Sequence, residues 1–186
     1  MCNRARGPDD PRTVHVQFAL HWETPRPMDN TFAPATIVPN KRIYAIRHDE
    51  QCRRGLDVMT WDVLGGQAAY AMTNVRDIDR RWRKLATVKE NRCLIPVQEF
   101  AEWTTERFDL RDDKPAIKGE MWFAVPDQPV FAIAGFWQQM GEKNYCAMMT
   151  CDANELVAPI HGKAMVTILE PADYDRWLTG SYEDVL

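Results

Sequence analysis

Short runs of apolar, β-branched and aromatic residues, separated by Gly, Pro and Asp, make up most of this chain and are typical of strands. The runs predicted to be strands are residues 42–47, 56–64, 92–103, 121–125, 130–138, 145–151 and 166–169. Helical spacing or helix start signals occur only at residues 14–22, 78–90 and 171–178, with a single helical turn at 154–157. We therefore expect an α+β fold: a single domain over residues 1–186, with a mostly antiparallel, barrel-like sheet and a few peripheral helices.

Three connecting segments also carry predictions. Residues 106–118 are charged and contain a proline, which favours a solvated surface loop. Residues 126–129, with a proline at each end, are predicted to join the neighbouring strands as a hairpin-type connection. Residues 29–34 are predicted to be turn and extended chain, because Pro34 disfavours helix in the residue before it.

Composition places the chain among ordinary soluble globular proteins, with 186 residues, 45% of them hydrophobic and 27% charged. No apolar run is long enough to span a bilayer and no signal-peptide core follows Met1, so we expect a cytoplasmic protein with no membrane partner. The net charge of −4 argues against a generally cationic nucleic-acid binder. It still allows a local basic groove.

The cysteines argue against a disulfide framework and against a zinc knuckle, since they are five in number and form no Cys-x-x-Cys pair. Cys146, Cys151 and His161 could together hold a metal ion. The apolar run around the two cysteines instead favours buried side chains, so we expect no metal and no cofactor.

Candidate chemistry begins at Cys2, which becomes an N-terminal cysteine if Met1 is removed. Its α-amine, with a pKa near ~7.7–8.0, and its thiol, with a pKa near ~8.5, would both lie close to their reactive forms at neutral pH. The amine can form a Schiff base with an aldehyde, and the thiol can then close a five-membered thiazolidine. The alternative is an incidental cysteine on a frayed terminus.

Three further segments contain candidates for a site, and the main residue of each has a simpler explanation. Asn74 and Arg76 follow a Gly-Gly break, Glu102 lies on a predicted strand beside Trp103, and His161 follows a Pro-Ile pair. Asn74 alone could be a turn former, Glu102 a solvent-facing carboxylate and His161 a partly buried structural imidazole.

Five ordered motifs extend over nearly the whole chain. They are Met1-Cys2-Asn3-Arg4, Thr73-Asn74-Val75-Arg76, residues 92–103, Ala158-Pro159-Ile160-His161-Gly162-Lys163-Ala164-Met165 and Tyr174-Asp175-Arg176-Trp177-Leu178. Together these motifs resemble the SOS response-associated peptidase family, whose members sense abasic sites in single-stranded DNA. The chain differs from the common family pattern at Asn3, at Trp61-Asp62 and in a shortened segment 65–72.

The resemblance implies a function and a set of site residues. It implies an enzyme that cleaves off its own Met1 and then crosslinks the exposed nucleophile Cys2 to an abasic site. Glu102 would be the catalytic carboxylate, His161 would assist proton transfer, and Asn74 would hold the reacting terminus. A nucleoid-associated monomer acting on abasic single-stranded DNA is the expected state.

DNA contacts follow from the same resemblance and from local charge. Arg4 and Arg76 match DNA-contacting arginines, and Trp103 adjoins the site. Arg80 and Arg81, with their neighbours Arg83 and Lys84, could extend a cationic track, and Trp61, Trp82 or Trp103 could stack on unpaired bases. The alternative for residues 80–84 is a solvated helix face.

Two other functions fit parts of the sequence. An N-terminal-nucleophile amidohydrolase also begins at a processed cysteine and uses its own amine as the base. A non-catalytic single-stranded DNA-binding domain, in which Cys2 is incidental, would need only the basic groove.

Overall fold

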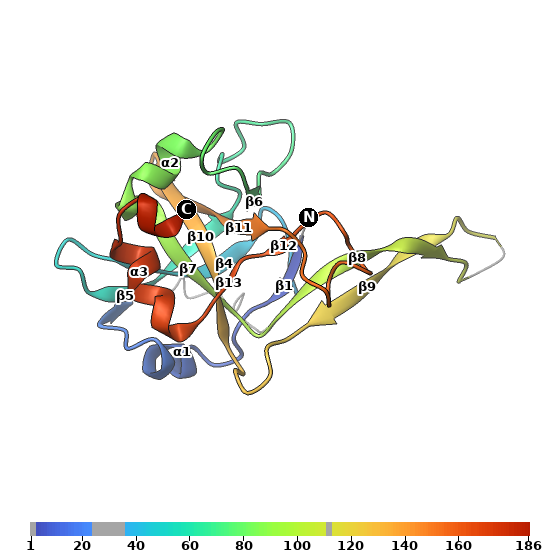
Figure 1. Cartoon of the computed structure of the whole chain (residues 1–186), viewed down its shortest axis with the longest axis horizontal. Helices are drawn as coiled ribbons and strands as arrows, with labels where there is room; N and C mark the ends of the chain where they lie inside the picture. The colour runs from blue at the N-terminus through green and yellow to red at the C-terminus, as the bar shows by residue number, and fades with distance from the viewer. Residues whose placement is uncertain (1–2, 24–35, 111–112) are drawn as a thin grey trace.

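A five-stranded barrel forms the centre of the molecule (Figure 1). The computed structural model describes residues 3–23, 36–110 and 113–186. The barrel strands follow the order β11-β10-β7-β4-β5, and a parallel pairing of β5 with β11 closes it. Their bounds are β4 Arg42–His48, β5 Arg54–Trp61, β7 Arg92–Val97, β10 Phe131–Met140 and β11 Lys143–Cys151.

Four short strands extend the barrel wall. β6 pairs with β11 in parallel and β2 with β5 in parallel, while β12 and β13 are antiparallel to β11 and β10. Their bounds are β2 Trp22–Glu23, β6 Asn74–Val75, β12 Met165–Val166 and β13 Ile168–Leu169.

A second antiparallel sheet lies beside the barrel and carries the start of the chain. Its order is β3-β1-β8-β9, with bounds β1 Arg4–Arg6, β3 Thr36–Ile37, β8 Glu99–Phe108 and β9 Ile117–Phe123. Strands β8 and β9 form a long hairpin that projects away from the barrel (Figure 1). Only Gln98 separates β7 from β8, so the chain passes directly from the barrel wall into this sheet.

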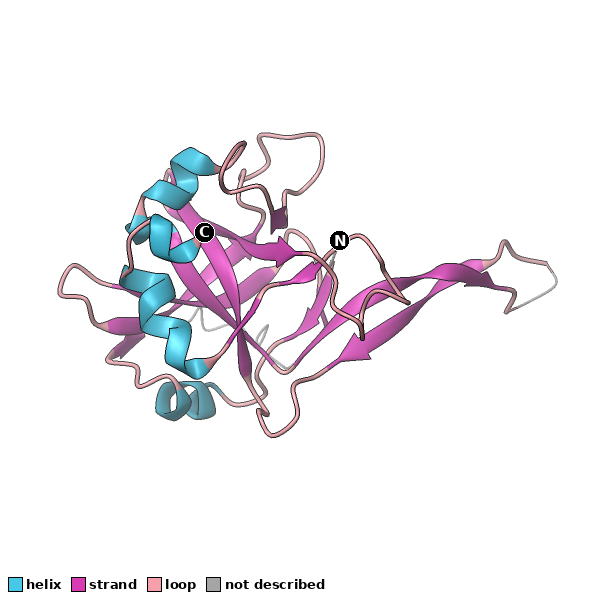
Figure 2. Cartoon of the chain, in the orientation of Figure 1, coloured by secondary structure: helices cyan, strands magenta, loops and turns pink. Residues whose placement is uncertain are grey.

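Successive side chains along the barrel strands point alternately into and out of the barrel. Apolar side chains therefore form two hydrophobic clusters, one inside the barrel and one outside it. Inward-facing residues fill the barrel: Ile43, Ala45, Met59, Trp61, Cys93, Ile95, Val97, Phe131, Ile133, Cys146 and Met148. Outward-facing residues pack under helices that gather on one side of the barrel (Figure 2). These helices are α1 Pro11–Gln17, α2 Arg83–Thr87 and α3 Tyr174–Thr179, with 3-10 turns at Lys89–Asn91, Pro171–Asp173 and Glu183–Val185.

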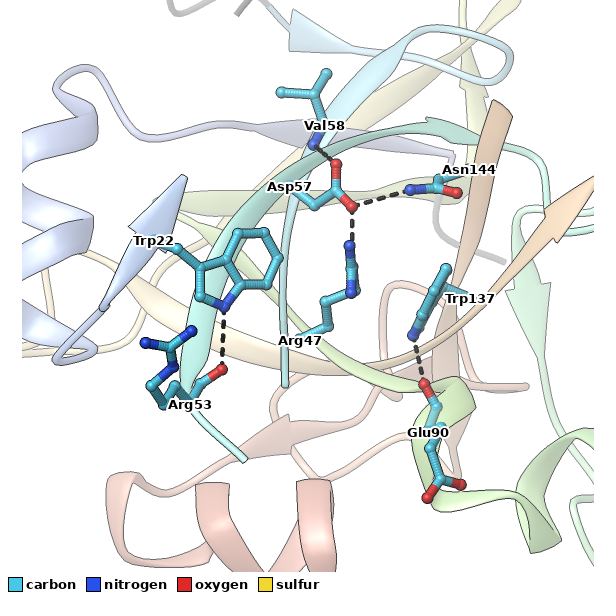
Figure 3. A network of polar contacts seen from close by, with 8 residues as sticks. All are labelled: Trp22, Arg47, Arg53, Asp57, Val58, Glu90, Trp137 and Asn144. Atoms are coloured by element: carbon cyan, nitrogen blue, oxygen red, sulfur yellow. Dashed lines mark hydrogen bonds and ion pairs between the residues drawn. The ribbon is translucent and has the colours of Figure 1, made fainter. Parts of the chain in front are cut away.

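A polar group surrounds Arg47 at the His48 end of β4 (Figure 3). The Arg47 guanidinium lies 4.7 Å from the ring centroids of both Trp22 and Trp137, one on each side. Its Nε donates to Asp57 Oδ2 at 2.9 Å, and Asn144 Nδ2 donates to the same oxygen at 2.9 Å. Because the buried carboxylate is paired, this end can be polar without an uncompensated charge.

The predicted fold class is confirmed, while several element bounds were wrong. Residues 92–103 were predicted as one strand but form β7 and β8 in different sheets, because the chain leaves the barrel at Gln98. Both ends of the segment 106–118, predicted as a loop, lie in strands β8 and β9, since cross-strand pairing extends to Phe108 and Ile117. Residues 126–129 do not form a hairpin: β10 pairs with β7 and β11, not with β9.

The predicted helices are shorter than their apolar spacing indicated. The helix expected at 14–22 begins at Pro11, where Asp10 caps it by accepting from the backbone N–H of Arg12, and ends at Gln17. Helix α2 covers only Arg83–Thr87 of the predicted 78–90. The prediction for residues 29–34 lies outside the described residues.

Arg92 ties the helical side to the barrel, although it was predicted only as a strand residue. Its side chain is 1% exposed and donates to the backbone carbonyls of Ala86, Trp177 and Gly180. These carbonyls belong to the ends of α2 and α3, where helical acceptors lack internal partners. Arg92 therefore supplies the hydrogen bonds that both helix ends need.

We expect Arg92→Met to lower the free energy of unfolding by about 2–4 kcal/mol, because it leaves several buried carbonyls without donors. Urea denaturation monitored by tryptophan fluorescence would measure this. Arg53→Met is the matched control, since Arg53 pairs with Asp49 on an exposed turn; its unfolding midpoint should hardly change. Equal midpoints for the two variants would contradict this role of Arg92.

Candidate functional site

The start of the described chain lies against β8, opposite a buried carboxyl group. Strand β1 pairs antiparallel with β8, with Arg4 opposite Ala101 and Ala5 opposite Phe100. Continuing this register by one residue places Asn3 opposite Glu102. Cys2 precedes Asn3 in the sequence and lies outside the described residues.

Glu102 is the most unusual acid among the described residues. It faces the inner side of the second sheet, as Phe100 does, and only 1% of it is exposed. Burial disfavours the charged form and raises the pKa of Glu102 from 4.5 to about 7. A carboxyl group with this pKa exchanges protons readily at neutral pH, which suits a general acid–base.

Asn74 comes from the barrel side and is connected to Asn3 through one hydroxyl group. Asn74 Nδ2 donates to Thr73 Oγ1 at 2.9 Å, and Thr73 Oγ1 donates to Asn3 Oδ1 at 3.0 Å. Both residues are buried, at 4% exposure for Thr73 and 7% for Asn74. The parallel pairing of β6 with β11, in which Asn74 lies opposite Met148, holds them in place.

His161 ends the turn that follows β11. Its backbone N–H donates to Val157 O at 2.9 Å, and Asn154 Oδ1 caps the start of the turn. Burial lowers the pKa of His161 below its usual 6.5, and the charges of Lys118 on β9 and Lys163 lower it further. The imidazole is therefore mainly neutral at neutral pH and can accept a proton.

Arg4 and Trp103 lie together on the opposite face of the second sheet. The Arg4 guanidinium is 5.1 Å from the Trp103 ring centroid and forms an ion pair of 2.8 Å with Glu120. Because residues alternate along β1 and β8, these side chains point away from Glu102. The strand that carries Arg4 nonetheless begins directly beside the site.

Arg76 follows β6 and reaches across to the His161 turn. Its Nη1 donates to Lys163 O at 2.8 Å, and its Nη2 pairs with the exposed Asp152. Figure 1 shows the orange-red chain between β11 and β12, which carries this turn. Arg76 thus lies on the same side of the barrel as His161.

The remaining predicted DNA contacts differ in exposure. Arg80 is exposed, and Arg81 stacks 5.2 Å from the Trp82 ring centroid just before α2. Trp61 is fully buried in the barrel and donates its Nε1–H to Thr73 O at 2.9 Å. It offers no face to a base, so its assignment as a stacking residue is corrected to a structural one.

The structure adds two residues that the sequence analysis did not select as site residues. Thr73 was quoted only as the start of the Thr73-Asn74-Val75-Arg76 motif. Asp62, 1% exposed, accepts backbone N–H bonds from Leu64, Gly66 and Met72 and so shapes the segment that leads to Thr73. An aspartate before Gly-Gly was the available signal, since such side chains commonly cap turns.

Metal ligation has no support among the described residues, where no group of three His, Cys, Asp or Glu side chains is arranged to hold an ion. Cys146 is fully buried in the barrel, where burial raises the pKa of its thiol. Nor does the described part of the chain contain a helix long and apolar enough to cross a membrane.

We expect the raised pKa of Glu102 to make the wild type lose stability relative to Glu102→Gln as the pH rises from about 4.5 to about 7. Between these pH values the Glu102 carboxyl is ionised in the unfolded chain but protonated in the folded chain. Ionisation therefore favours the unfolded state, and the free energy of unfolding of the wild type falls as the pH rises. The free energy of unfolding of the wild type, relative to that of Glu102→Gln, should fall by about 3 kcal/mol between pH 4.5 and pH 7. Below pH 4.5 the difference between the two proteins should be constant.

Urea denaturation over this pH range measures the difference. Glu106→Gln is the control, because Glu106 lies on the exposed part of the same strand and should show no comparable trend. If the free energies of unfolding of the wild type and Glu102→Gln differ by the same amount from acid to neutral pH, Glu102 ionises with an ordinary pKa.

The chain is similar to known proteins in sequence and in fold. A family model described as "SOS response associated peptidase (SRAP)" matches residues 1–185. A solved protein from Bordetella bronchiseptica is 23% identical, with 98% of this chain and 90% of that chain covered and a TM-score of 0.74. A solved protein from Bacteroides thetaiotaomicron is 18% identical, with 97% of this chain and 82% of that chain covered and a TM-score of 0.75.

A phage-related protein from Bordetella bronchiseptica is 16% identical, with 98% of this chain and 85% of that chain covered and a TM-score of 0.70. At these identities the solved structures show the fold alone. No curated protein matches the chain. On the family model, the chain belongs to the SOS response associated peptidase family, which supports a function associated with DNA damage.

Proposed function

We propose that the chain is an abasic-site sensor that removes its own Met1 and then crosslinks Cys2 to abasic sites in single-stranded DNA. The observation that carries the proposal is the buried Glu102 carboxyl, with a pKa of about 7, opposite Asn3. Cys2 is bonded to Asn3, and consecutive Cα atoms lie about 3.8 Å apart. The reacting residue is therefore adjacent in the chain to one that faces a general acid–base.

Removal of Met1 is hydrolysis of the peptide bond between Met1 and Cys2. The reaction consumes one water and frees the Cys2 amine. Glu102 takes a proton from the attacking group and returns it to the leaving amine, two steps that need a carboxyl poised near neutral pH. Asn74 contributes an amide whose orientation is fixed by Thr73.

Crosslinking uses the same groups on an aldehyde. The Cys2 amine attacks the aldehyde carbon of the ring-opened deoxyribose, and water leaves to give an imine. The thiol sulfur then adds to the imine carbon while its proton moves to the nitrogen, which closes a thiazolidine. Glu102 protonates the hydroxyl of the carbinolamine so that it departs as water, and the mainly neutral His161 accepts and passes on protons.

Single-stranded DNA binding then depends on local positive charge in a protein of net charge −4. Arg76 lies beside the His161 turn, and Arg4 stacks on Trp103, which supports phosphate contacts flanking the site. Arg80 and Arg81 are proposed as outer contacts. All of these groups belong to one chain, so we propose that a monomer carries out the reaction.

For the crosslink, the substrate is an oligonucleotide in which uracil glycosylase has produced an abasic site. We expect the mature wild type to form an adduct with it, and this adduct should survive a denaturing gel without reductant. Cys2→Ser keeps the amine but has a much weaker ring-closing nucleophile, so at most a labile species trapped by borohydride should form. His161→Ala should slow adduct formation by about 100-fold, the range of general acid–base catalysis.

Two results on such a gel would contradict the crosslink. One is a reductant-free stable adduct from Cys2→Ser. The other is no adduct from wild-type protein whose Met1 has been shown to be absent. An adduct with intact, undamaged single-stranded oligonucleotide would separately contradict the substrate assignment.

For DNA binding, we expect Arg76→Ala to weaken affinity for single-stranded DNA and to reduce the slope of log K against log salt by about 0.7 per lost phosphate contact. Fluorescence anisotropy over about 50–200 mM salt measures both. Arg53→Ala is the matched control, because it also removes an arginine paired with a surface aspartate. If both variants keep the wild-type slope, Arg76 does not contact phosphate.

A further inference from the structure

Thr73 occupies a position between the two segments that the proposed chemistry must hold together. Its hydroxyl donates to Asn3 Oδ1 at 3.0 Å and accepts from Asn74 Nδ2 at 2.9 Å. Resting on the proposed function, we infer that Thr73 and Asn3 form a positioning pair that fixes the N-terminal Cys2 and the Asn74 amide relative to Glu102.

The chemistry of the three groups fixes the direction of both hydrogen bonds. An amide oxygen can only accept, so the single hydroxyl proton of Thr73 is used on Asn3. The hydroxyl lone pair is then available to the Asn74 amide, which turns its nitrogen toward Thr73 and its oxygen away. One hydroxyl group therefore orients Asn74 and anchors Asn3 at the same time.

Thr73 is suited to this role because its own backbone is held by the barrel. Its carbonyl accepts from Trp61 Nε1 and from the backbone N–H of Met148, both at 2.9 Å. Just before it, the backbone N–H of Met72 donates to the buried Asp62 carboxylate at 2.8 Å. The hydroxyl is thus carried by a rigid part of the fold.

The start of the chain has two connections to the site as a result. On one side, the register of the β1–β8 ladder, continued by one residue beyond Arg4 and Ala101, places Asn3 opposite Glu102; on the other, Thr73 binds the Asn3 side chain. Strand β1 has only three residues, and the ends of a chain are where fraying is expected, so the hydrogen bond to Thr73 adds a side-chain tether at Asn3. A misplacement of about 1 Å commonly costs about 100-fold in rate.

Single-turnover adduct formation with abasic single-stranded DNA tests this pair. Thr73→Val keeps the shape but removes the hydroxyl, so adduct formation should slow by about 10- to 100-fold. Thr73→Ser keeps the hydroxyl and should restore most of the rate. Thr150→Val is the matched control: it removes a hydroxyl that is also buried and bonds Val75 O in the same segment, but contacts neither Asn3 nor Asn74.

A second measurement is independent of DNA and of self-processing. Cys2 is exposed by a site-specific protease, and its condensation with glyoxylate, which gives a thiazolidine with any N-terminal cysteine, is followed as a function of pH. Wild type should differ in its pH profile from a short Cys-Asn-Arg peptide, and Thr73→Val should approach the peptide. This readout decides the inference even if wild type forms no DNA adduct.

The double variant gives the sharpest outcome. If Asn3 and Thr73 act through one bond, Asn3→Ala with Thr73→Val should react about as slowly as Thr73→Val alone. The inference is overturned if the two effects multiply, or if Thr73→Val matches Thr150→Val in rate and wild type in its glyoxylate pH profile. Thermal unfolding of each variant separates these results from loss of fold.

Discussion

The antiparallel pairing of β1 with β8 is the contact on which the candidate site depends. It consists of three residue pairs, Arg4 with Ala101, Ala5 with Phe100 and Arg6 with Glu99. This short ladder covers one edge of β8, where Ala5 and Phe100 enter the core and Glu102 is 1% exposed. The same pairing that brings the start of the chain to Glu102 therefore contributes to the burial that raises its pKa.

Burying a carboxyl group costs free energy, and the barrel provides the stability that offsets this cost. The barrel has apolar side chains inside it, a second cluster under the helices, and paired charges at Arg47 and Asp57. Arg92 likewise donates, with one side chain, to backbone carbonyls at the ends of two helices. Arg47, Asp57 and Arg92 are thus paired structurally, whereas Glu102 has a pKa at which its proton is easily exchanged.

Local patterns in the sequence were sufficient for the fold class and for most strands, whereas the candidate site residues came from the resemblance to the family. The local patterns were not sufficient for the boundary at Gln98, because β7 and β8 read as one apolar run and only tertiary pairing separates them. Nor did they show that Trp61 is buried, since an indole has the same sequence signal in a barrel as in a binding face. Thr73 was missed because its role depends on Asn3, which is distant in sequence and is brought close only by the fold.

Intact mass spectrometry of untagged protein, with and without an oligonucleotide that carries one abasic site, tests the central claim most directly. The account predicts that the protein alone has lost the mass of Met1. With the oligonucleotide, it predicts a new species equal to the sum of the processed protein and the oligonucleotide, less one water. Processed protein that remains at its own mass in the presence of the abasic oligonucleotide would contradict the account.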